Sequence, residues 1–324
     1  MTSPLLQVRH LTTRFGRDSR AVTAVNDVSF DVNAGETLAI VGESGSGKSV
    51  TALSIMRLID PPGMIAGGEI LFDGVDLAQM PEAGMRKLRG NSIAMIFQEP
   101  MTSLNPSLTI GVQIAEPVNL HDGLPWRESY DRAEELLRRV RVPDARSRLA
   151  SYPHQFSGGM RQRIMIAMAL ACRPKLIIAD EPTTALDVTV QAQILELLKD
   201  LTRETGAALI LITHNLGIVA RYADRVCVMY AGRVVETARS TELFARPMHP
   251  YTRGLLASIP RLEQPVGSNL MPIGGQPPDL SRLPPGCAFN PRCGQSVPRC
   301  FAEAPRLQMV SDSHSQACWV AGNA

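Results

Sequence analysis

Two glycine-rich segments of this chain have the residue types that bind phosphate at the start of a helix. The first runs from Gly42 to Ser49, reads GESGSGKS and fits the phosphate-binding pattern G-x-x-x-x-G-K-[ST]. The second, FSGGM at residues 156–160, comes just before a long apolar run that is typical of a helix. Because a helix N-terminus has unpaired N–H groups and partial positive charge, both segments are candidate anion sites.

The residues of the first segment have different expected roles in binding a nucleotide. Its glycines let the backbone wrap the phosphates, Lys48 is placed to bind the β- and γ-phosphates, and the Ser49 hydroxyl is placed to ligate Mg²⁺. A continuous apolar run over residues 37–41 predicts a buried strand before the loop, and residues 50–58 continue as a helix. We assign the nucleotide to Gly42, Glu43, Ser44, Gly45, Ser46, Gly47, Lys48, Ser49 and Val50.

Two adjacent carboxylates follow another predicted strand. The apolar run over residues 176–180 ends at Asp180, and Glu181 comes next. A carboxylate at the carboxyl end of a strand is placed to bind Mg²⁺ directly or through water. Asp180 is therefore a candidate metal ligand together with Ser49, and Glu181 is placed to polarise the attacking water as a catalytic residue.

Three further residues join the candidate site. Gln98 follows a predicted strand and is placed to ligate Mg²⁺ and to sense the γ-phosphate. His214 follows the strand expected over residues 208–213 and is placed to bond the γ-phosphate and hold the water. Phe15, near the first strand, could stack on adenine. Taken singly, each type is more often structural, so the prediction depends on their combination.

The order of these pieces resembles the ATP-binding cassette (ABC) ATPase family. The resemblance implies an α/β P-loop fold with an antiparallel β subdomain, in a nucleotide-binding domain over residues 1–240. It also implies an inserted helical subdomain at about residues 106–172 that carries the second glycine segment. In this family, the phosphate loop of one subunit meets that segment of another, so the active species is a dimer that binds ATP and Mg²⁺. The additional nucleotide contacts that the family implies are Ser157, Gly158, Gly159 and Asp187.

Other segments extend the resemblance to the ATP-binding subunits of oligopeptide/dipeptide ABC importers. These are the SGGMRQR form of the signature, EPMTSLNP at 99–106, HPYTRGLL at 249–256 and PIGGQPPDL at 272–280. The resemblance implies peptide import through two separate permease subunits, with a second ABC ATPase subunit and an extracellular or periplasmic substrate-binding protein as partners. Nickel and glutathione importers belong to the same subfamily and stay open as alternatives.

A soluble ABC ATPase that acts in translation or on DNA is the alternative from another class. Members of the first kind usually carry two cassettes in one chain, and members of the second kind insert a long coiled coil. Neither pattern is visible in this sequence. An exporter subunit is a further alternative, against which the importer-type C-terminal region argues.

Composition is that of a globular protein without a strong charge. The chain has 324 residues, and 33 Lys and Arg against 31 Asp and Glu give a net charge of +2, which does not indicate a nucleic-acid partner. The apolar runs are far shorter than the ~20 residues that span a bilayer, and the N-terminus lacks a signal-peptide pattern. We expect a cytosolic chain that lies peripherally on the cytoplasmic face of the membrane through its partners.

The C-terminal region, residues 241–324, is expected to be a loop-rich extension. Residues 247–324 contain 12 of the 24 prolines and four of the six cysteines. The cysteine spacing, C-x5-C-x6-C-x17-C, is wider than the C-x-x-C pairs of usual zinc sites. Four thiolates could hold a [4Fe–4S] cluster or Zn²⁺, or the thiols could be reduced without metal; resemblance to importer subunits favours the cluster. The candidate ligands are Cys287, Cys293, Cys300 and Cys318.

Overall fold

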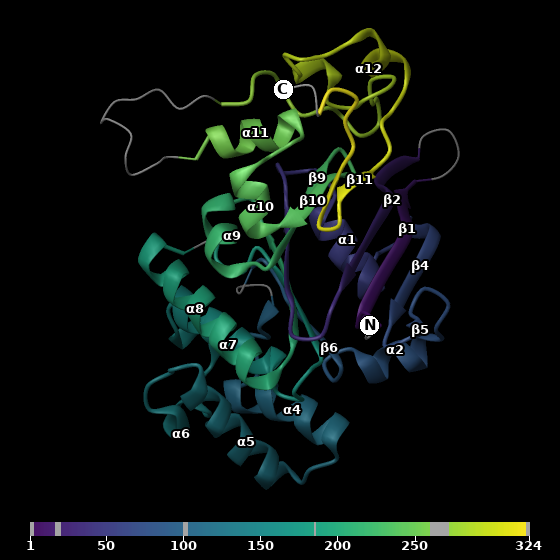
Figure 1. Cartoon of the computed structure of the whole chain (residues 1–324). Helices are drawn as coiled ribbons and strands as arrows, with labels where there is room; N and C mark the ends of the chain where they lie inside the picture. Colours follow the sequence, from purple (N-terminus) through teal and green to yellow (C-terminus); the bar gives the residue numbers. More distant parts are fainter. Residues whose placement is uncertain (1–2, 17–20, 100–102, 185, 260–271, 322–324) are drawn as a thin grey trace. The chain divides into compact units, whose positions relative to one another are not determined.

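A computed structural model describes residues 3–16, 21–99, 103–184, 186–259 and 272–321 (Figure 1). The chain divides into two compact units, each described by itself. The first unit comprises Met1–Val32, Thr37–Ala78 and Thr213–Ala324, and the second comprises Asn33–Glu36 and Gln79–Ile212.

An antiparallel sheet forms one part of the first unit. Its strand order is β2-β1-β4-β5, and β1 pairs with both β2 and β4. Residues of β1 alternate between buried and more exposed positions over part of its length, as expected for a strand with one face on the core. The strands are β1 (Leu6–Phe15), β2 (Val22–Val32), β4 (Gly63–Phe72) and β5 (Val75–Asp76).

A second set of strands in the first unit has the order β11-β12-β10-β9-β3. Strand β3 lies parallel to β9, and the other neighbours are antiparallel. Strand β3 is apolar and almost wholly buried, as predicted, and leads through the phosphate loop into helix α1. The strands are β3 (Thr37–Val41), β9 (Arg225–Tyr230), β10 (Arg233–Arg239), β11 (Gln308–Ser311) and β12 (His314–Gln316).

The helices of the first unit include several from the C-terminal region. Helices α9 and α10 contact the strands β3, β9 and β10, and Tyr251 of α11 is fully buried in the same core as Val41 and Val228. The C-terminal region therefore shares the hydrophobic core of the phosphate loop's own unit. The helices are α1 (Lys48–Ile55), α9 (Leu216–Tyr222), α10 (Ser240–Ala245), α11 (Pro250–Ala257), the 3₁₀ helix η3 (Asn290–Arg292) and α12 (Pro298–Ala302).

Three parallel strands form the centre of the second unit. Strand β7 pairs with β6 on one side and β8 on the other, and every residue of β7 and β8 is buried. The strands predicted over residues 176–180 and 208–213 are thereby confirmed, and the strand predicted before Gln98 ends at Ile96. They are β6 (Ile93–Ile96), β7 (Leu176–Asp180) and β8 (Ala208–Thr213), the last of which ends one residue beyond this unit.

Helices make up the rest of the second unit, and several fall between residues 106 and 172, where the sequence predicts a helical insert. Helix α5 contacts α4, α6 and α7, so these helices pack on one another. The division of the chain into a cassette with this insert and a C-terminal extension stays a prediction. The helices are α2 (Glu82–Leu88), α4 (Ile110–Asp122), α5 (Trp126–Arg139), α6 (Ala145–Arg148), the 3₁₀ helix η2 (Pro153–Gln155), α7 (Gly158–Ala169) and α8 (Val188–Thr205).

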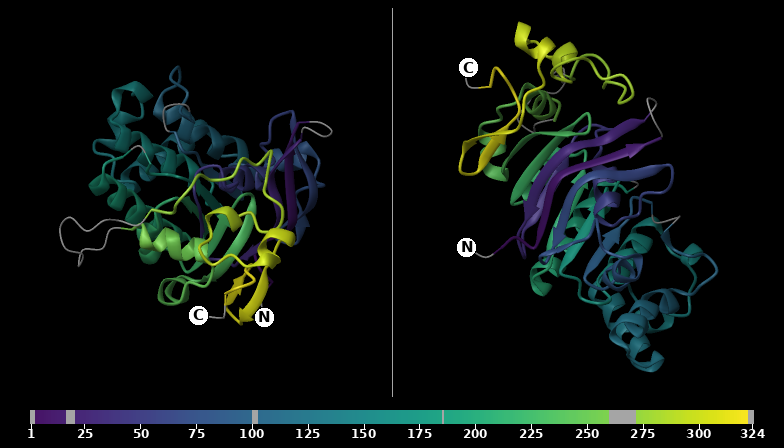
Figure 2. Two further views of the ribbon diagram at one scale, coloured as in Figure 1. Left: turned by 90° about the horizontal axis from the view of Figure 1, so that it is seen from above. Right: turned by 90° about the vertical axis from the view of Figure 1, so that its right-hand side faces the viewer.

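The loop-rich C-terminal region also contains two strands that the sequence does not predict. The hairpin of β11 and β12 joins β10, with Glu236 opposite Gln316 and Ala238 opposite His314 (Figure 2). The buried His314 ring contacts the Glu236 carboxylate, with 2.7 Å between Nε2 and Oε1. Because β11 is exposed along its whole length, no apolar alternation marks it in the sequence.

Candidate nucleotide-binding site

The backbone of the phosphate loop requires glycine at defined positions. Gly42, Gly45 and Gly47 all have positive φ, and Gly47 is the N-cap of α1. A Cβ on Gly42 would lie 2.2 Å from the Met229 carbonyl oxygen. A Cβ on Gly47 would lie 2.5 Å from a backbone carbonyl of β2. The loop is therefore packed tightly against β2 and β9, and larger residues are excluded on one side.

Two side chains of the loop fit an anionic ligand. Lys48 is 4% exposed, and its Nζ donates to the carbonyl oxygens of Gly42 and Glu43, each at 2.9 Å. The buried Ser46 hydroxyl has no hydrogen-bond partner within the described structure. A buried ammonium held by neutral carbonyls gains from a phosphate, and the first turn of α1 adds N–H groups without intrahelical acceptors. These residues fit a nucleotide phosphate.

The remaining residues assigned to the nucleotide take different positions. Ser44 is exposed, and Ser49 and Val50 lie half-buried in the first turn of α1. Phe15 is half-buried at the end of β1, where its ring lies against Gly63, because a Cβ there would be 2.6 Å from Cε1. Its contact with adenine stays a prediction.

Glu43 has a partner that the sequence does not predict. Its carboxylate accepts two hydrogen bonds from the Arg292 guanidinium, at 2.6 and 2.9 Å. Its backbone N–H donates to the hydroxyl oxygen of Tyr251 at 2.8 Å. The side chain of Glu43 is therefore engaged by the C-terminal region. Sequence spacing gives no signal for this contact, because 249 residues separate Glu43 from Arg292.

The acidic strand end of the second unit has a strained backbone. Asp180 is 6% exposed as the last residue of β7, and Glu181 has φ of 45°. The Glu181 N–H donates to the Ile212 carbonyl oxygen of β8 at 3.0 Å, which holds this conformation. Left-handed backbone at a residue other than glycine costs energy, and such residues are enriched at functional sites.

The structure brings Gln98 and Glu181 together. Gln98 Nε2 donates to Glu181 Oε2 at 3.3 Å, and the Thr184 hydroxyl donates to the same oxygen at 2.9 Å. Thr184 is not among the site residues predicted from the sequence. Its position three residues after Glu181 is a spacing at which a hydroxyl can reach back to the earlier side chain. His214 is exposed just beyond β8, in the first unit.

The second glycine segment forms a capped helix start. Ser157 is the N-cap of α7, and its hydroxyl accepts a hydrogen bond from the Met160 N–H at 3.4 Å. Ser157 and Gly158 are exposed, so the helix N-terminus is accessible in this unit. Phe156, the residue before Ser157, is buried, with only 4% of it exposed. The Arg148 guanidinium carbon lies 5.5 Å from the centre of its ring.

Helix α8 begins next to this segment. Asp187 is its N-cap and accepts a hydrogen bond from the Val190 N–H at 2.9 Å. A Cβ on Gly159 would lie 2.9 Å from Val190 Cγ1, so the two helix starts are in close contact. Asp187 thus has a structural role in the chain, and its predicted contact with a nucleotide stays a prediction.

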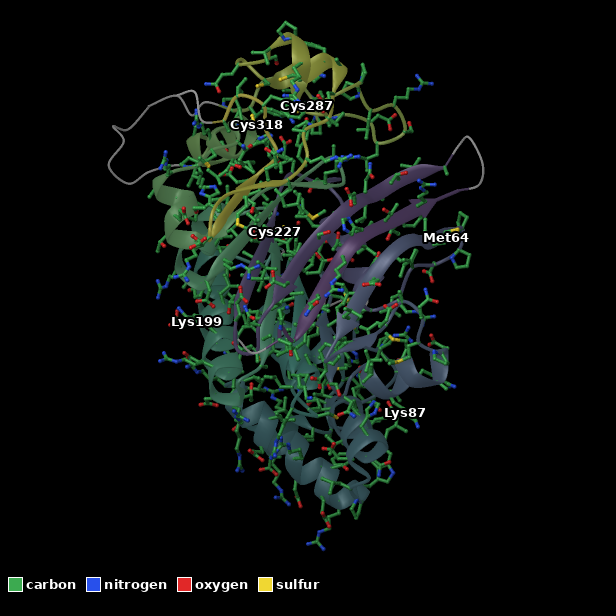
Figure 3. All side chains as sticks on the ribbon, turned by 45° about the vertical axis from the view of Figure 1, so that its right-hand side comes forward. Met64, Lys87, Lys199, Cys227, Cys287 and Cys318 are labelled. Carbon is green, nitrogen blue, oxygen red and sulfur yellow. The ribbon has the colours of Figure 1, made fainter. Side chains whose placement is uncertain are left out.

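The four cysteines of the C-terminal region are free thiols, and Figure 3 shows Cys287 and Cys318 in this region. Burial above all, and to a lesser degree the nearby thiols of the other three cysteines, raise the pKa of the Cys287 thiol to about 11. Across the described residues, no three His, Cys, Asp or Glu side chains are grouped so as to hold a metal ion. The expected iron–sulfur cluster or zinc therefore has no support in this arrangement.

Two known protein families match separate parts of this sequence. Residues 25–184 match the ABC transporter family, and residues 235–300 match the oligopeptide/dipeptide transporter C-terminal region. A Brucella melitensis relative is 54% identical, with 97% of this chain and 96% of the relative covered. This chain belongs to the ABC transporter ATPases. The predicted α/β P-loop fold of ABC type and the ATP-hydrolysing activity are thereby confirmed.

Two named relatives and a solved structure show how far the similarity extends. The ABC ATPase is 51% identical to the oligopeptide transport ATP-binding protein OppD of Salmonella typhimurium, with 97% of this chain and 93% of the relative covered. It is 51% identical to the dipeptide transport ATP-binding protein DppD of Bacillus subtilis, with coverages of 98% and 94%. A dimeric post-hydrolysis structure of the ATP-binding cassette MJ0796 with ADP and Pi has a TM-score of 0.65 at 28% identity, with coverages of 72% and 98%.

Among the helices in the described ranges, none combines the length and the apolar character of a membrane-spanning helix.

Proposed function

We propose that this ABC ATPase binds MgATP at its phosphate loop and uses hydrolysis to power the import of peptides. The observation that carries the proposal is the phosphate loop itself, with the buried Lys48 ammonium and the unpartnered Ser46 hydroxyl at the start of α1. Peptide as the solute is supported by the match of residues 235–300 and by the names of the relatives. Nickel and glutathione are the alternative solutes.

The residues that the sequence assigns to the metal and the water supply the chemistry in this proposal. Asp180, Ser49 and Gln98 hold Mg²⁺, which offsets charge on the phosphates. Glu181 polarises the attacking water, and His214 contacts the γ-phosphate. The hydrogen bond between Gln98 and Glu181 supports a shared site for metal and water.

The working assembly is a dimer of ABC ATPase subunits beneath two permease subunits, on the cytoplasmic face of the membrane. One chain has one phosphate loop and one signature, Ser157-Gly158-Gly159, and a head-to-tail pair completes two sites. The dimeric MJ0796 cassette supports this arrangement. The second ATPase is a homologous chain or a second copy, and a substrate-binding protein delivers the solute.

Ser157→Arg tests the composite site. The arginine blocks the accessible N-terminus of α7, so we expect MgATP binding to the variant's own phosphate loop to persist while ATP hydrolysis is lost. Lys48→Ala is the matched variant, because it should lose MgATP binding as well as hydrolysis. Equilibrium titration with MgATP and a phosphate-release assay separate the two. Loss of MgATP binding in a folded Ser157→Arg chain would contradict the proposal.

A metal cluster in the C-terminal region is a second proposal, kept apart from the first. The support is the C-x5-C-x6-C-x17-C spacing of the four cysteines and the resemblance to importer subunits, and the arrangement of the thiols adds none. A [4Fe–4S] cluster would require the thiolates, with Zn²⁺ as the alternative occupant. Iron, sulfide and zinc analysis of anaerobically purified protein tests it, and a colourless preparation without metal rejects both occupants.

A further inference from the structure

The second residue of the phosphate loop is held by a strong ion pair from the C-terminal region. Arg292 Nη1 donates to Glu43 Oε2 at 2.6 Å, and Nη2 donates to Oε1 at 2.9 Å. The Arg292 side chain is 4% exposed and that of Glu43 is 26% exposed. A two-pronged pair that is largely shielded from water is both stronger and more directional than a surface ion pair.

The Arg292 side chain is itself held by several neighbouring groups. Its Nε donates to the Gly274 carbonyl oxygen at 2.9 Å, and its Nη1 lies 3.4 Å from the Tyr230 hydroxyl oxygen. The guanidinium carbon is 5.9 Å from the ring centres of both Tyr230 and Phe289. These contacts hold the planar guanidinium in one orientation, with Nη1 and Nη2 directed at the Glu43 carboxylate.

A second contact holds the backbone of the same residue. The Glu43 N–H donates to the Tyr251 hydroxyl oxygen at 2.8 Å. Tyr251 is fully buried, and its ring lies 4.6 Å from the ring of Tyr230 and 5.5 Å from that of Phe289, measured between centres. Both the side chain and the backbone of Glu43 are therefore anchored in one aromatic cluster of β9 and the C-terminal region.

The anchored residue is a direct partner of the phosphate-binding lysine. Lys48 Nζ donates to the carbonyl oxygen of Glu43 at 2.9 Å and to that of Gly42 at the same distance. A movement of Glu43 would displace one of the two carbonyls that hold the ammonium. The position of the C-terminal region is thereby linked to the position of Lys48 through one peptide unit.

We propose that Glu43, Tyr251 and Arg292, together the loop clamp, position the phosphate loop, so that the C-terminal region sets the affinity of this ATPase for MgATP. The inference rests on the proposed function, in which this loop binds MgATP. A loop that is already ordered loses less conformational freedom on binding, and the clamp supplies that order in advance. Arg292 and Tyr251 act through Glu43 and Lys48, so they are positioning residues.

A double-mutant cycle in the full chain tests the loop clamp. The variants are Arg292→Gln, Glu43→Gln and both together, and the readout is the Kd for the non-hydrolysable analogue Mg-AMPPNP by calorimetry. We expect each single variant to bind about tenfold more weakly, because it removes a charge-assisted pair. The double variant should bind no more weakly than the poorer single one, since both changes break the same pair. In steady-state hydrolysis, KM should change more than kcat.

The matched control is Arg299→Gln, which removes an exposed pair with Glu303 in the same region and should leave the Kd as in the wild type. A folded Arg292→Gln chain with a Kd within about twofold of the wild type would overturn the loop clamp, as would full additivity in the cycle. If the glutamine variants do not fold, Arg292→Lys and Tyr251→Phe replace them, with weaker binding expected and wild-type binding overturning the proposal. A wild-type chain that binds no Mg-AMPPNP would overturn the proposed function, and the loop clamp with it.

Discussion

At the scale of single residues, Glu181 has features of a group poised for chemistry. Its backbone is in the left-handed region, and its carboxylate oxygen accepts hydrogen bonds from Gln98 and Thr184. The carboxylate at the end of β7 could be predicted from the sequence, because an apolar run ending in two acids marks the edge of a parallel sheet. The Thr184 contact was missed, because its spacing from Glu181 allows a hydroxyl to reach back but a threonine in a turn has many equivalent roles.

Glu181→Gln should separate binding from hydrolysis. The amide keeps the shape of the side chain but cannot accept a proton from water, so we expect MgATP affinity near that of the wild type and a kcat lower by about a hundredfold or more. Phosphate release and nucleotide titration measure the two quantities. The control is Glu69→Gln, which changes an exposed carboxylate of β4 that pairs with Arg9 of β1. Normal turnover in Glu181→Gln would mean that another group activates the water.

At the scale of elements, the strands β3 and β7 could be predicted because they are continuous apolar runs. The hairpin of β11 and β12 could not, since its strands are short and β11 is exposed. They depend on pairing with β10, and so on a contact far along the chain. The same is true of the contact between Arg292 and Glu43, which sequence patterns within one element cannot indicate.

Two glycines of the phosphate loop, Gly45 and Gly47, both have positive φ but differ in what surrounds them. Gly47 has φ of 99° and a backbone oxygen 2.5 Å from where a Cβ would be, whereas nothing lies within 4 Å of a Cβ on Gly45, with φ of 77°. We expect Gly45→Ala to lower the free energy of unfolding by about 1–2 kcal/mol, from backbone strain alone. Gly47→Ala should cost clearly more, because the loop must also move. Urea unfolding without nucleotide compares them, and equal losses would contradict the packing argument.

The start of α11 predicts a pH dependence. Burial lowers the pKa of His249 from 6.5 to about 4, while its Nδ1 accepts a hydrogen bond from the Tyr251 N–H at 3.0 Å. The unfolded chain therefore binds more protons between pH 6.5 and 4, and the free energy of unfolding should fall as pH drops through this window, by on the order of 3 kcal/mol.

His249→Asn should flatten that part of the pH dependence, because asparagine keeps the cap acceptor but does not titrate. Urea unfolding at several pH values between 7.5 and 4.5 measures the effect. If wild type and His249→Asn lost stability in parallel, protonation of His249 would not be the cause.

At the scale of the whole molecule, the family and its enzymatic class follow from separated motifs that agree in order along the chain. The proposed dimer rests on the family resemblance, together with the one phosphate loop and one signature that the sequence contains. The proposed solute follows only from the match of residues 235–300 and the names of the relatives, because in the proposed assembly its selection belongs to the permeases and the binding protein.

Peptide uptake in the source cells shows whether this ATPase powers peptide import, since all partners are present there. The chromosomal gene is replaced by the wild type, by Lys48→Ala or by the control Lys87→Ala, which changes an exposed lysine of α2 (Figure 3). Uptake of a radiolabelled mixture of short peptides is then measured at equal protein levels. We expect Lys48→Ala to abolish the uptake that the wild type and Lys87→Ala support. Undiminished peptide uptake with Lys48→Ala would contradict the proposed function.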